Sequence, residues 1–344
     1  MEEDLNVRKK AELTLGGGVR LPSGFVFPYR ISRSTAGPGA GSASAVFSFG
    51  GHRVKKSISY GSGEFELVEE NSRLSMKRNG VPFLEEVKIE PIVFHCPEQA
   101  FFNLDHRCIF NCAFCVSPLL SKDLDKGLSD EDMVRMTKEA ISDGQKVVSV
   151  SLTSGVFGSV DETVERFVSC VSKLRKAFPE LPIGVEPYVS GKGHIRALKE
   201  AGATEIKLNI QSPNRAIFEK VCPELDYDNI IEMLLYSVDV FGSGKVTSNM
   251  IFGMGETDEE IKETTEFLCL NGVIPTYRAL RTNAVNQDQL VSAVGRQPPV
   301  SADRAIKLAR MQKEKLLAHG LDTRECRTMC IECTCCDLVP FRDL

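Results

Sequence analysis

The chain has 344 residues, of which 42% are hydrophobic and 26% charged, and its formal net charge at pH 7 is −5. This length suits one large domain with an appendage. The interspersed charges argue against a nucleic-acid surface, and no stretch approaches the roughly 20 apolar residues of a transmembrane helix. Because the first residues, MEEDLNVRKKAELTL, are unlike a secretory signal, we expect a cytoplasmic protein.

Residues 1–95 are predicted to form a β-rich N-terminal region. A short amphipathic helix opens it. The patterns that follow alternate between apolar and polar residues and are interrupted by Gly and Asn-Gly, which is typical of short antiparallel strands.

Strands and helices alternate from about residue 100 onwards. The expected strands are 101–105, 146–155, 183–189, 205–212, 245–257 and 273–283. The expected helices are 128–144, 161–177, 194–203, 226–240, 258–271 and 302–319. We interpret the strands as continuous apolar runs buried on both faces, which predicts a parallel sheet. Right-handed crossovers then give an α/β fold, a partial or closed βα barrel over residues 96–300, followed by a Cys-rich segment over residues 301–344.

Polar and small residues follow the expected strands. Because chemistry in such barrels takes place at the carboxyl ends of the strands, these residues are candidates for a site. They are Thr153, Ser154, Gly155, Glu186, Asn209, Gln211, Gly253, Glu256, Arg278 and Arg281. For the two arginines, solvent-facing salt bridges are an equally good interpretation.

Twelve cysteines are the unusual feature, and without a secretory signal they indicate metal binding or redox chemistry rather than disulfides. Cys108, Cys112 and Cys115 have the spacing C-x3-C-x2-C, which can hold three corners of a four-iron cluster and leave one iron open. A zinc site is the alternative, but His106 is poorly spaced to complete it. Cys170, Cys222 and Cys269 are interpreted as buried hydrophobic residues, and Cys96 is left without a role.

This spacing, with Phe114 before the last cysteine, resembles the signature of the radical S-adenosylmethionine (SAM) superfamily, and the resemblance extends over residues 100–285. Residues 153–155 stand where that family contacts the amino group of SAM. The segment SNMIFGMGET at 248–257 resembles the family's GxIxGxxE segment, whose backbone meets adenine, although Asn249 replaces the first glycine.

From their place on the last strand, Arg278 and Arg281 are candidates to bind a substrate carboxylate or the cofactor. The resemblance implies that Glu186, Asn209 and Gln211 bind the methionyl and ribose parts of SAM. It also implies a 4Fe–4S cluster that cleaves SAM reductively. The products would be methionine and a 5′-deoxyadenosyl radical, which abstracts hydrogen from an unactivated carbon. An electron donor such as ferredoxin or flavodoxin would reduce the cluster.

A second cysteine group ends the chain. Its members are Cys326, Cys330, Cys333, Cys335 and Cys336, and the first three repeat the C-x3-C-x2-C spacing. We interpret the group as the ligands of an auxiliary 4Fe–4S cluster on a tail that folds back over the barrel mouth. A structural zinc site is the alternative, because zinc accepts the same thiolates.

The IFGMGET segment resembles biotin-synthase-like enzymes, and the closest subgroup is the two-component archaeal lipoyl synthases, which would add a second radical SAM protein as partner. The expected reaction is sulfur insertion into a small-molecule or carrier-protein-bound substrate, such as an octanoyl chain. Biotin synthases lack the terminal cysteine group and the β-rich N-terminal region, so two alternatives stay open. One is cofactor biosynthesis or peptide modification with a substrate-binding or electron-transferring cluster, and the other is a non-catalytic iron–sulfur carrier.

Overall fold

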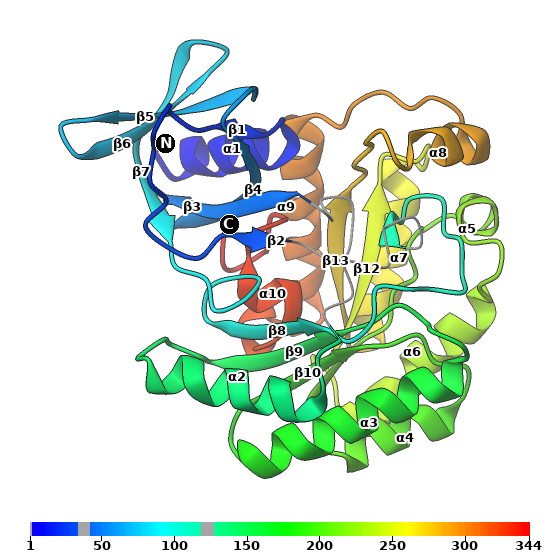
Figure 1. Cartoon of the computed structure of the whole chain (residues 1–344). Helices are drawn as coiled ribbons and strands as arrows, with labels where there is room; N and C mark the ends of the chain where they lie inside the picture. Colours follow the sequence, from blue (N-terminus) through cyan, green and yellow to red (C-terminus); the bar gives the residue numbers. More distant parts are fainter. Residues whose placement is uncertain (1, 34–41, 118–126) are drawn as a thin grey trace.

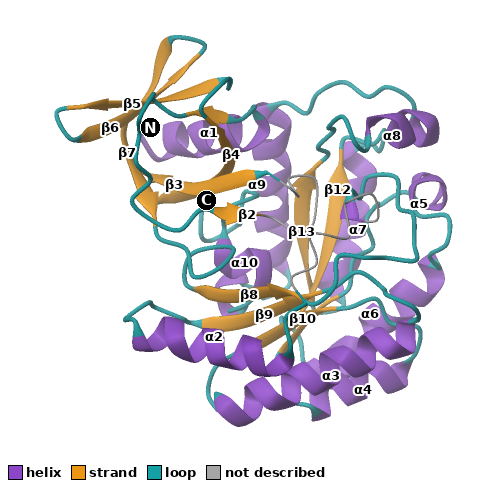
Figure 2. Ribbon diagram, viewed as in Figure 1, coloured by secondary structure: helices purple, strands orange, loops and turns teal. Residues whose placement is uncertain are grey.

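The computed structural model describes residues 2–33, 42–117 and 127–344. Two sheets organise these residues, a seven-stranded sheet near the N-terminus and a six-stranded sheet after it (Figure 1). Helices cover the outer side of the six-stranded sheet, as Figure 2 shows by its colours. Among the described residues, no helix is long and apolar enough to cross a membrane.

The N-terminal sheet follows helix α1 (Glu2–Leu15). Its strands are β1 (Val19–Arg20), β2 (Ser32–Arg33), β3 (Ala43–Phe49), β4 (His52–Ser59), β5 (Phe65–Glu70), β6 (Arg73–Arg78) and β7 (Val81–Glu90). They lie in the order β2-β3-β4-β1-β5-β6-β7, and β7 also pairs with β3. This last pairing closes six strands into a small barrel around Phe47, Phe65 and Met76, which leaves fewer exposed edges.

Antiparallel pairing was predicted for this region, and it is confirmed for β3–β4, β5–β6 and β6–β7. Strand β1 differs, because it pairs in parallel with both β4 and β5. The reason is topological: hairpins join antiparallel neighbours, whereas the chain leaves β1 and returns to it only after long connections.

The six-stranded sheet is parallel throughout, as predicted. Its strands are β8 (Gln99–Asn103), β9 (Ser149–Thr153), β10 (Ile183–Glu186), β11 (Glu205–Lys207), β12 (Val246–Phe252) and β13 (Val273–Ala279), in sequence order across the sheet. Within the described ranges β13 does not pair with β8, so the barrel is partial rather than closed.

Helices connect these strands and continue into the tail. They are α2 (Asp130–Ser142), α3 (Val160–Ala177), α4 (Lys192–Glu200), α5 (Arg215–Val221), α6 (Tyr227–Phe241), α7 (Asp258–Leu270), α8 (Gln287–Val294), α9 (Ala302–Ala318), the 3-10 turn η3 (Thr323–Glu325) and α10 (Met329–Cys333). A capping box formed by Ser129 and Asp132 begins α2. Helices α5 and α8 were not predicted.

The two faces of the parallel sheet have different chemistry. Val150, Leu152 and Ile206 belong to one apolar core with the covering helices. Ser151 and Glu205 alternate with them in the strands and therefore lie on the opposite, inner face. Our interpretation of the strands as continuous apolar runs thus holds only for the outer face, because the inner face is buried but polar.

The C-terminal tail covers this inner face. The backbone N–H of Met329 donates to Ser151 Oγ at 2.9 Å, and the Thr328 hydroxyl donates to Glu205 at 2.6 Å. A Cβ on Gly184 would lie 2.2 Å from Thr328 Oγ1, so β10 needs a glycine where the tail crosses it. The tail was expected over the barrel mouth, but it enters along the first halves of the strands, where its buried backbone finds polar partners.

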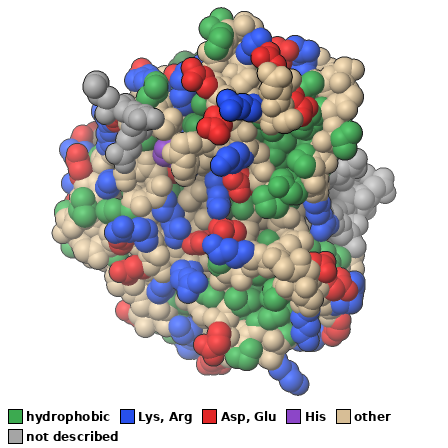
Figure 3. All heavy atoms as spheres, turned by 90° about the vertical axis from the view of Figure 1, so that its left-hand side faces the viewer, with side chains coloured by type: hydrophobic (Ala, Val, Ile, Leu, Met, Phe, Trp, Pro, Cys, Tyr) green, Lys and Arg blue, Asp and Glu red, His purple; other side chains and the backbone are tan. Residues whose placement is uncertain are grey.

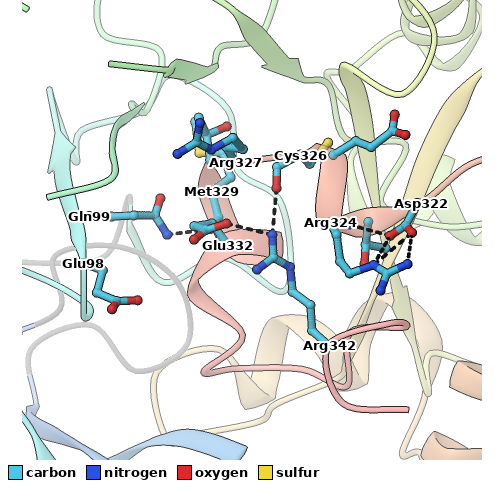
Figure 4. A network of polar contacts seen from close by, with 12 residues as sticks. Glu98, Gln99, Asp322, Arg324, Cys326, Arg327, Met329, Glu332 and Arg342 are labelled. Atoms are coloured by element: carbon cyan, nitrogen blue, oxygen red, sulfur yellow. Dashed lines mark hydrogen bonds and ion pairs between the residues drawn. The ribbon is translucent and has the colours of Figure 1, made fainter. Parts of the chain in front are cut away.

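Arg342, near the end of the chain, contacts other residues of the C-terminal tail. Figure 4 shows its guanidinium between two groups, the Cys326 carbonyl oxygen at 3.0 Å and the Glu332 carboxylate at 2.7 Å. On the other side of α10, the Gln99 amide donates to the Met329 carbonyl at 3.1 Å. Strand β8 and the chain terminus therefore hold α10 between them.

A buried ion pair joins the two ends of the chain. Lys10 Nζ lies 2.6 Å from Asp343 Oδ1, and His52 Nδ1 lies 3.1 Å from the same oxygen. Burial opposes ionisation of Asp343, but the Lys10 ammonium and His52 outweigh it and hold the pKa of Asp343 below its ordinary value.

The outer surface differs from this buried pair. On the face shown in Figure 3, basic and acidic side chains are interspersed.

Lys10→Met should lower the free energy of unfolding by about 3–5 kcal/mol, because it leaves the Asp343 carboxylate buried without its cation. Arg8→Ala is the matched control. The side chains of Lys10 and Asp343 are 0% and 2% exposed, whereas those of Arg8 and Asp303 are 47% and 75% exposed. The control should therefore leave the free energy of unfolding almost unchanged. Urea unfolding measures both, and equal losses would contradict a special role for the buried pair in joining the chain ends.

Candidate functional site

The first cysteine group lies on the loop after β8, at the carboxyl ends of the parallel strands. Burial and the neighbouring Cys112 sulfur raise the pKa of the Cys108 thiol, and burial with both other thiols does the same for Cys115. The three sulfurs therefore lie within electrostatic range of one another. Iron binding would release their protons, because the thiolate is the ligand.

The loop interlocks with the end of β9. The Gly155 N–H donates to the Asp105 carbonyl at 2.6 Å, and the Val156 N–H lies 3.4 Å from Cys108 Sγ. A Cβ on Gly155 would lie 2.3 Å from the Arg107 carbonyl oxygen. The small residue predicted at this strand end is thus required, because the cysteine loop packs directly on its backbone.

The neighbouring residues of that motif also contact this region. The Thr153 carbonyl accepts from Leu104 N–H at 2.8 Å, and the Ser154 hydroxyl donates to the Gly155 carbonyl at 2.7 Å. The motif at residues 153–155 thus forms one wall of the cysteine loop.

Sequence reasoning missed two residues that support the loop. Asn286, fully buried before α8, donates to the Phe114 carbonyl at 3.0 Å. Cys222, at the end of α5, is buried as predicted, but its sulfur also forms a hydrogen bond with Cys112, which together with burial raises the pKa of Cys112 strongly. The asparagine-rich stretch RTNAVNQ after the last strand was the available signal for Asn286.

Three polar residues meet at the ends of β10 and β11. The Asn209 amide donates to Glu186 Oε1 at 2.7 Å, and Lys207 Nζ lies 3.0 Å from the same oxygen. Burial opposes the charge on Glu186, but Lys207 and then Asn209 outweigh it and hold the pKa of Glu186 below its ordinary value. Glu186 is therefore a carboxylate at neutral pH, whose position is fixed by two neighbours.

Gln211 lies just beyond this group. Its backbone has a φ of 62°, and its N–H donates to the Asn249 carbonyl at 2.9 Å. The Asn249 N–H in turn donates to Asn209 Oδ1 at 3.1 Å. The asparagine that replaces the first glycine of the GxIxGxxE pattern thus joins the same network.

The glycine turn after β12 is held by Glu256. Its buried carboxylate accepts from the N–H groups of Gly253 at 2.6 Å and Met254 at 2.8 Å. Arg304, from helix α9, pairs with the same carboxylate at 2.9 Å. Gly253 needs its positive φ of 102° in this turn, which few other residues tolerate. Glu256 therefore acts by shaping the turn.

The second cysteine group divides in the structure. Cys333 forms hydrogen bonds with the sulfurs of Cys335 and Cys96, which hold the pKa of Cys333 well below its ordinary value. Cys336 packs against the same cluster. Cys326 instead belongs to a separate apolar cluster, and its thiol donates to the Gly244 carbonyl at 3.0 Å.

Arg278 and Arg281 both hold the tail. Arg278 Nη2 lies 2.6 Å from Asp337 and 3.3 Å from Cys330 Sγ, while Arg281 Nη2 donates to the Cys336 carbonyl at 3.3 Å. Arg278 Nε is buried without a hydrogen-bond partner among the described residues. That atom is available to a bound group at the inner face.

Outside the gaps at 34–41 and 118–126, no three His, Cys, Asp or Glu side chains are placed to hold a metal ion. A four-iron cluster is bound at separate corners, so its ligands need not converge on one point.

Comparison with known proteins gives a sequence match to the radical SAM superfamily over residues 102–268. The lipoyl synthase of Pyrobaculum aerophilum is 26% identical over 216 residues, which cover 61% of this chain and 72% of that protein. The lipoyl synthase of Buchnera aphidicola is 26% identical over 186 residues, which cover 53% and 56% respectively.

Solved structures share the fold. The FeFe-hydrogenase maturase HydG from Carboxydothermus hydrogenoformans aligns with a TM-score of 0.52 and 17% identity, covering 64% of this chain and 52% of that one. Methylornithine synthase aligns with a TM-score of 0.51 and 16% identity, covering 64% and 63%. The chain thus spans about half of the maturase. The sequence match over residues 102–268 and the cysteine loop at the carboxyl ends of six parallel strands thus make the chain similar to the radical SAM superfamily.

Proposed function

We propose that this radical SAM enzyme inserts sulfur at an unactivated carbon, in the manner of a lipoyl synthase. The observation that carries the proposal is the presence of two cysteine groups at one polar inner face. The first lies at the carboxyl ends of the strands, and Cys330 of the second reaches Arg278 and Lys207 on the same face. The similarity to lipoyl synthases supports this reaction over other radical chemistry.

Cys108, Cys112 and Cys115 would hold the SAM-binding 4Fe–4S cluster. The fit rests on three thiols of one short loop and on a loop backbone that is already fixed by Gly155 and Asn286. With SAM bound, the cluster supplies a 5′-deoxyadenosyl radical that abstracts hydrogen from the substrate. The protein's part is to hold the reactants in place and exclude water.

The strand-end residues would orient SAM. Glu186 is an anion and could accept from the SAM ammonium or ribose, while Lys207 and Asn209 keep its carboxylate in place. The turn at Gly253 offers backbone groups to adenine, and Glu256 keeps the turn in shape from behind. Arg278 would bind SAM or a substrate carboxylate through its Nε, which has no hydrogen-bond partner among the described residues.

The C-terminal cysteines would hold an auxiliary 4Fe–4S cluster that donates the sulfur. A small-molecule or carrier-protein-bound substrate, an external electron donor and a second radical SAM protein are the partners that this proposal requires. If the auxiliary cluster is not consumed, the alternative is substrate binding or electron transfer by that cluster during cofactor or peptide chemistry.

The triple variant Cys108→Ala, Cys112→Ala, Cys115→Ala should abolish formation of 5′-deoxyadenosine from SAM under dithionite, measured by liquid chromatography. The control is Cys269→Ala, since Cys269 is buried in the cluster with Ile274 and Leu316, apart from the loop. This control should retain activity. Continued SAM cleavage by the triple variant would rule out the assignment of the cluster loop.

Asn209→Ala removes the amide that fixes Glu186, and it should weaken SAM binding by about 1–3 kcal/mol, or roughly 5- to 150-fold. Calorimetry with the reconstituted protein measures this loss, while iron content reports that the cluster is intact. Asn229→Ala, which removes an amide donating to the Val189 carbonyl at 3.0 Å, is the control. Unchanged affinity in Asn209→Ala would mean that SAM binds elsewhere.

If the auxiliary cluster is sacrificed, anaerobically reconstituted protein should contain about eight irons, and a single turnover should transfer labelled sulfide from that cluster to the product. The measurement combines iron analysis with mass spectrometry of the product. A second cluster that keeps its sulfide through many turnovers would contradict sulfur insertion, while leaving SAM cleavage in place.

A further inference from the structure

Cys96 lies next to the C-terminal cysteines although more than 230 residues separate them in sequence. It is fully buried in the turn before β8, where Val93 N–H donates to its carbonyl at 3.1 Å. It packs in one cluster with Cys333 and Cys335, and the Cys335 thiol donates to the Cys333 carbonyl at 3.1 Å. Val46 and Ile92 form the apolar wall around these three thiols.

Buried cations surround this group. Lys55 is buried, with Nζ 2.7 Å from the His95 carbonyl and 3.1 Å from Ser32 Oγ, and its backbone N–H donates to the Cys335 carbonyl at 2.8 Å. None of these contacts involves a carboxylate. A buried ammonium is stabilised by a neighbouring anion, and a thiolate-bound metal cluster carries negative charge.

Cys330, which lies on helix α10 with Cys333, contacts two more cations. Its sulfur lies 3.3 Å from Arg278 Nη2 and 3.9 Å from Lys207 Nζ. Asp337 pairs with Arg278, and Glu186 pairs with Lys207. Neither carboxylate is among the contacts of Lys55. Positive charge thus faces the thiols from strands β4, β11 and β13.

Cys326 has none of these features. It packs with Cys269, Ile274 and Leu316 in an apolar cluster that contains none of the other four thiols. Its place in a C-x3-C-x2-C repeat therefore does not bring it to the other thiols.

We propose that Cys96 is a ligand of the second metal centre, together with Cys330, Cys333 and Cys335, and that Cys326 is not. Each of the four thiols loses its proton to solvent and forms one sulfur–metal bond. The centre then joins the turn before β8 to the C-terminal tail. The identity of the metal as an iron–sulfur cluster rests on the proposed function. The choice of the four ligands is independent of it.

The test uses the full chain carrying the triple Cys→Ala change at positions 108, 112 and 115, so that only the second centre binds metal. In this background Cys96→Ser and Cys326→Ser are compared, both at fully buried positions. After anaerobic reconstitution with iron and sulfide, elemental analysis gives iron and zinc per chain, and electron paramagnetic resonance follows the reduced cluster. We expect about four irons in the parent and in Cys326→Ser, and a loss of at least half of that iron in Cys96→Ser.

Retention of full metal by Cys96→Ser, or its loss from Cys326→Ser alone, would overturn the ligand set. Circular dichroism and urea unfolding of the metal-free proteins detect a folding defect. In both measurements, Cys96→Ser should give the same result as the metal-free parent. If Cys96→Ser unfolds, Cys96→His replaces it, and a cluster with altered electron paramagnetic resonance supports ligation, whereas an unaltered spectrum contradicts it. Zinc that depends on Cys96 would support the ligand set and contradict the proposed sulfur insertion.

Discussion

The docking of residues 327–330 on the inner face of the parallel sheet is the contact on which the rest of the structure depends. A chain segment buried there needs partners for its backbone groups. The sheet provides them: Glu205 accepts from the Arg327 N–H at 3.0 Å, and Ser151 accepts from the Met329 N–H at 2.9 Å. This docking directs the Cys330 sulfur towards Arg278. It also explains why the inner face is polar.

The two cysteine groups meet the same parallel sheet at different ends of its strands. The first group lies at the carboxyl ends of the strands, and the tail packs against their first halves. Glu186, Lys207 and Asn209 lie between these approaches and form one polar network.

Local signals predicted much of this fold. The alternating strands and helices after residue 100 and the cysteine loop each depend on a few neighbouring residues, so sequence alone identified them. The closure of the N-terminal barrel through β3 and β7 and the parallel pairing of β1 depend on long-range contacts and were not predicted. The terminal cysteines show the same limit: spacing grouped Cys326 with Cys330, whereas packing groups Cys96 with Cys333.

The central claim is that one chain holds two different metal centres, of which only the first has an open iron for SAM. Electron paramagnetic resonance of the reduced, reconstituted protein with and without SAM tests this claim most directly. We predict two superimposed cluster signals, of which SAM changes only the one that depends on Cys108, Cys112 and Cys115. A spectrum that SAM leaves entirely unchanged, or one in which the SAM-sensitive signal survives loss of those cysteines, would contradict it.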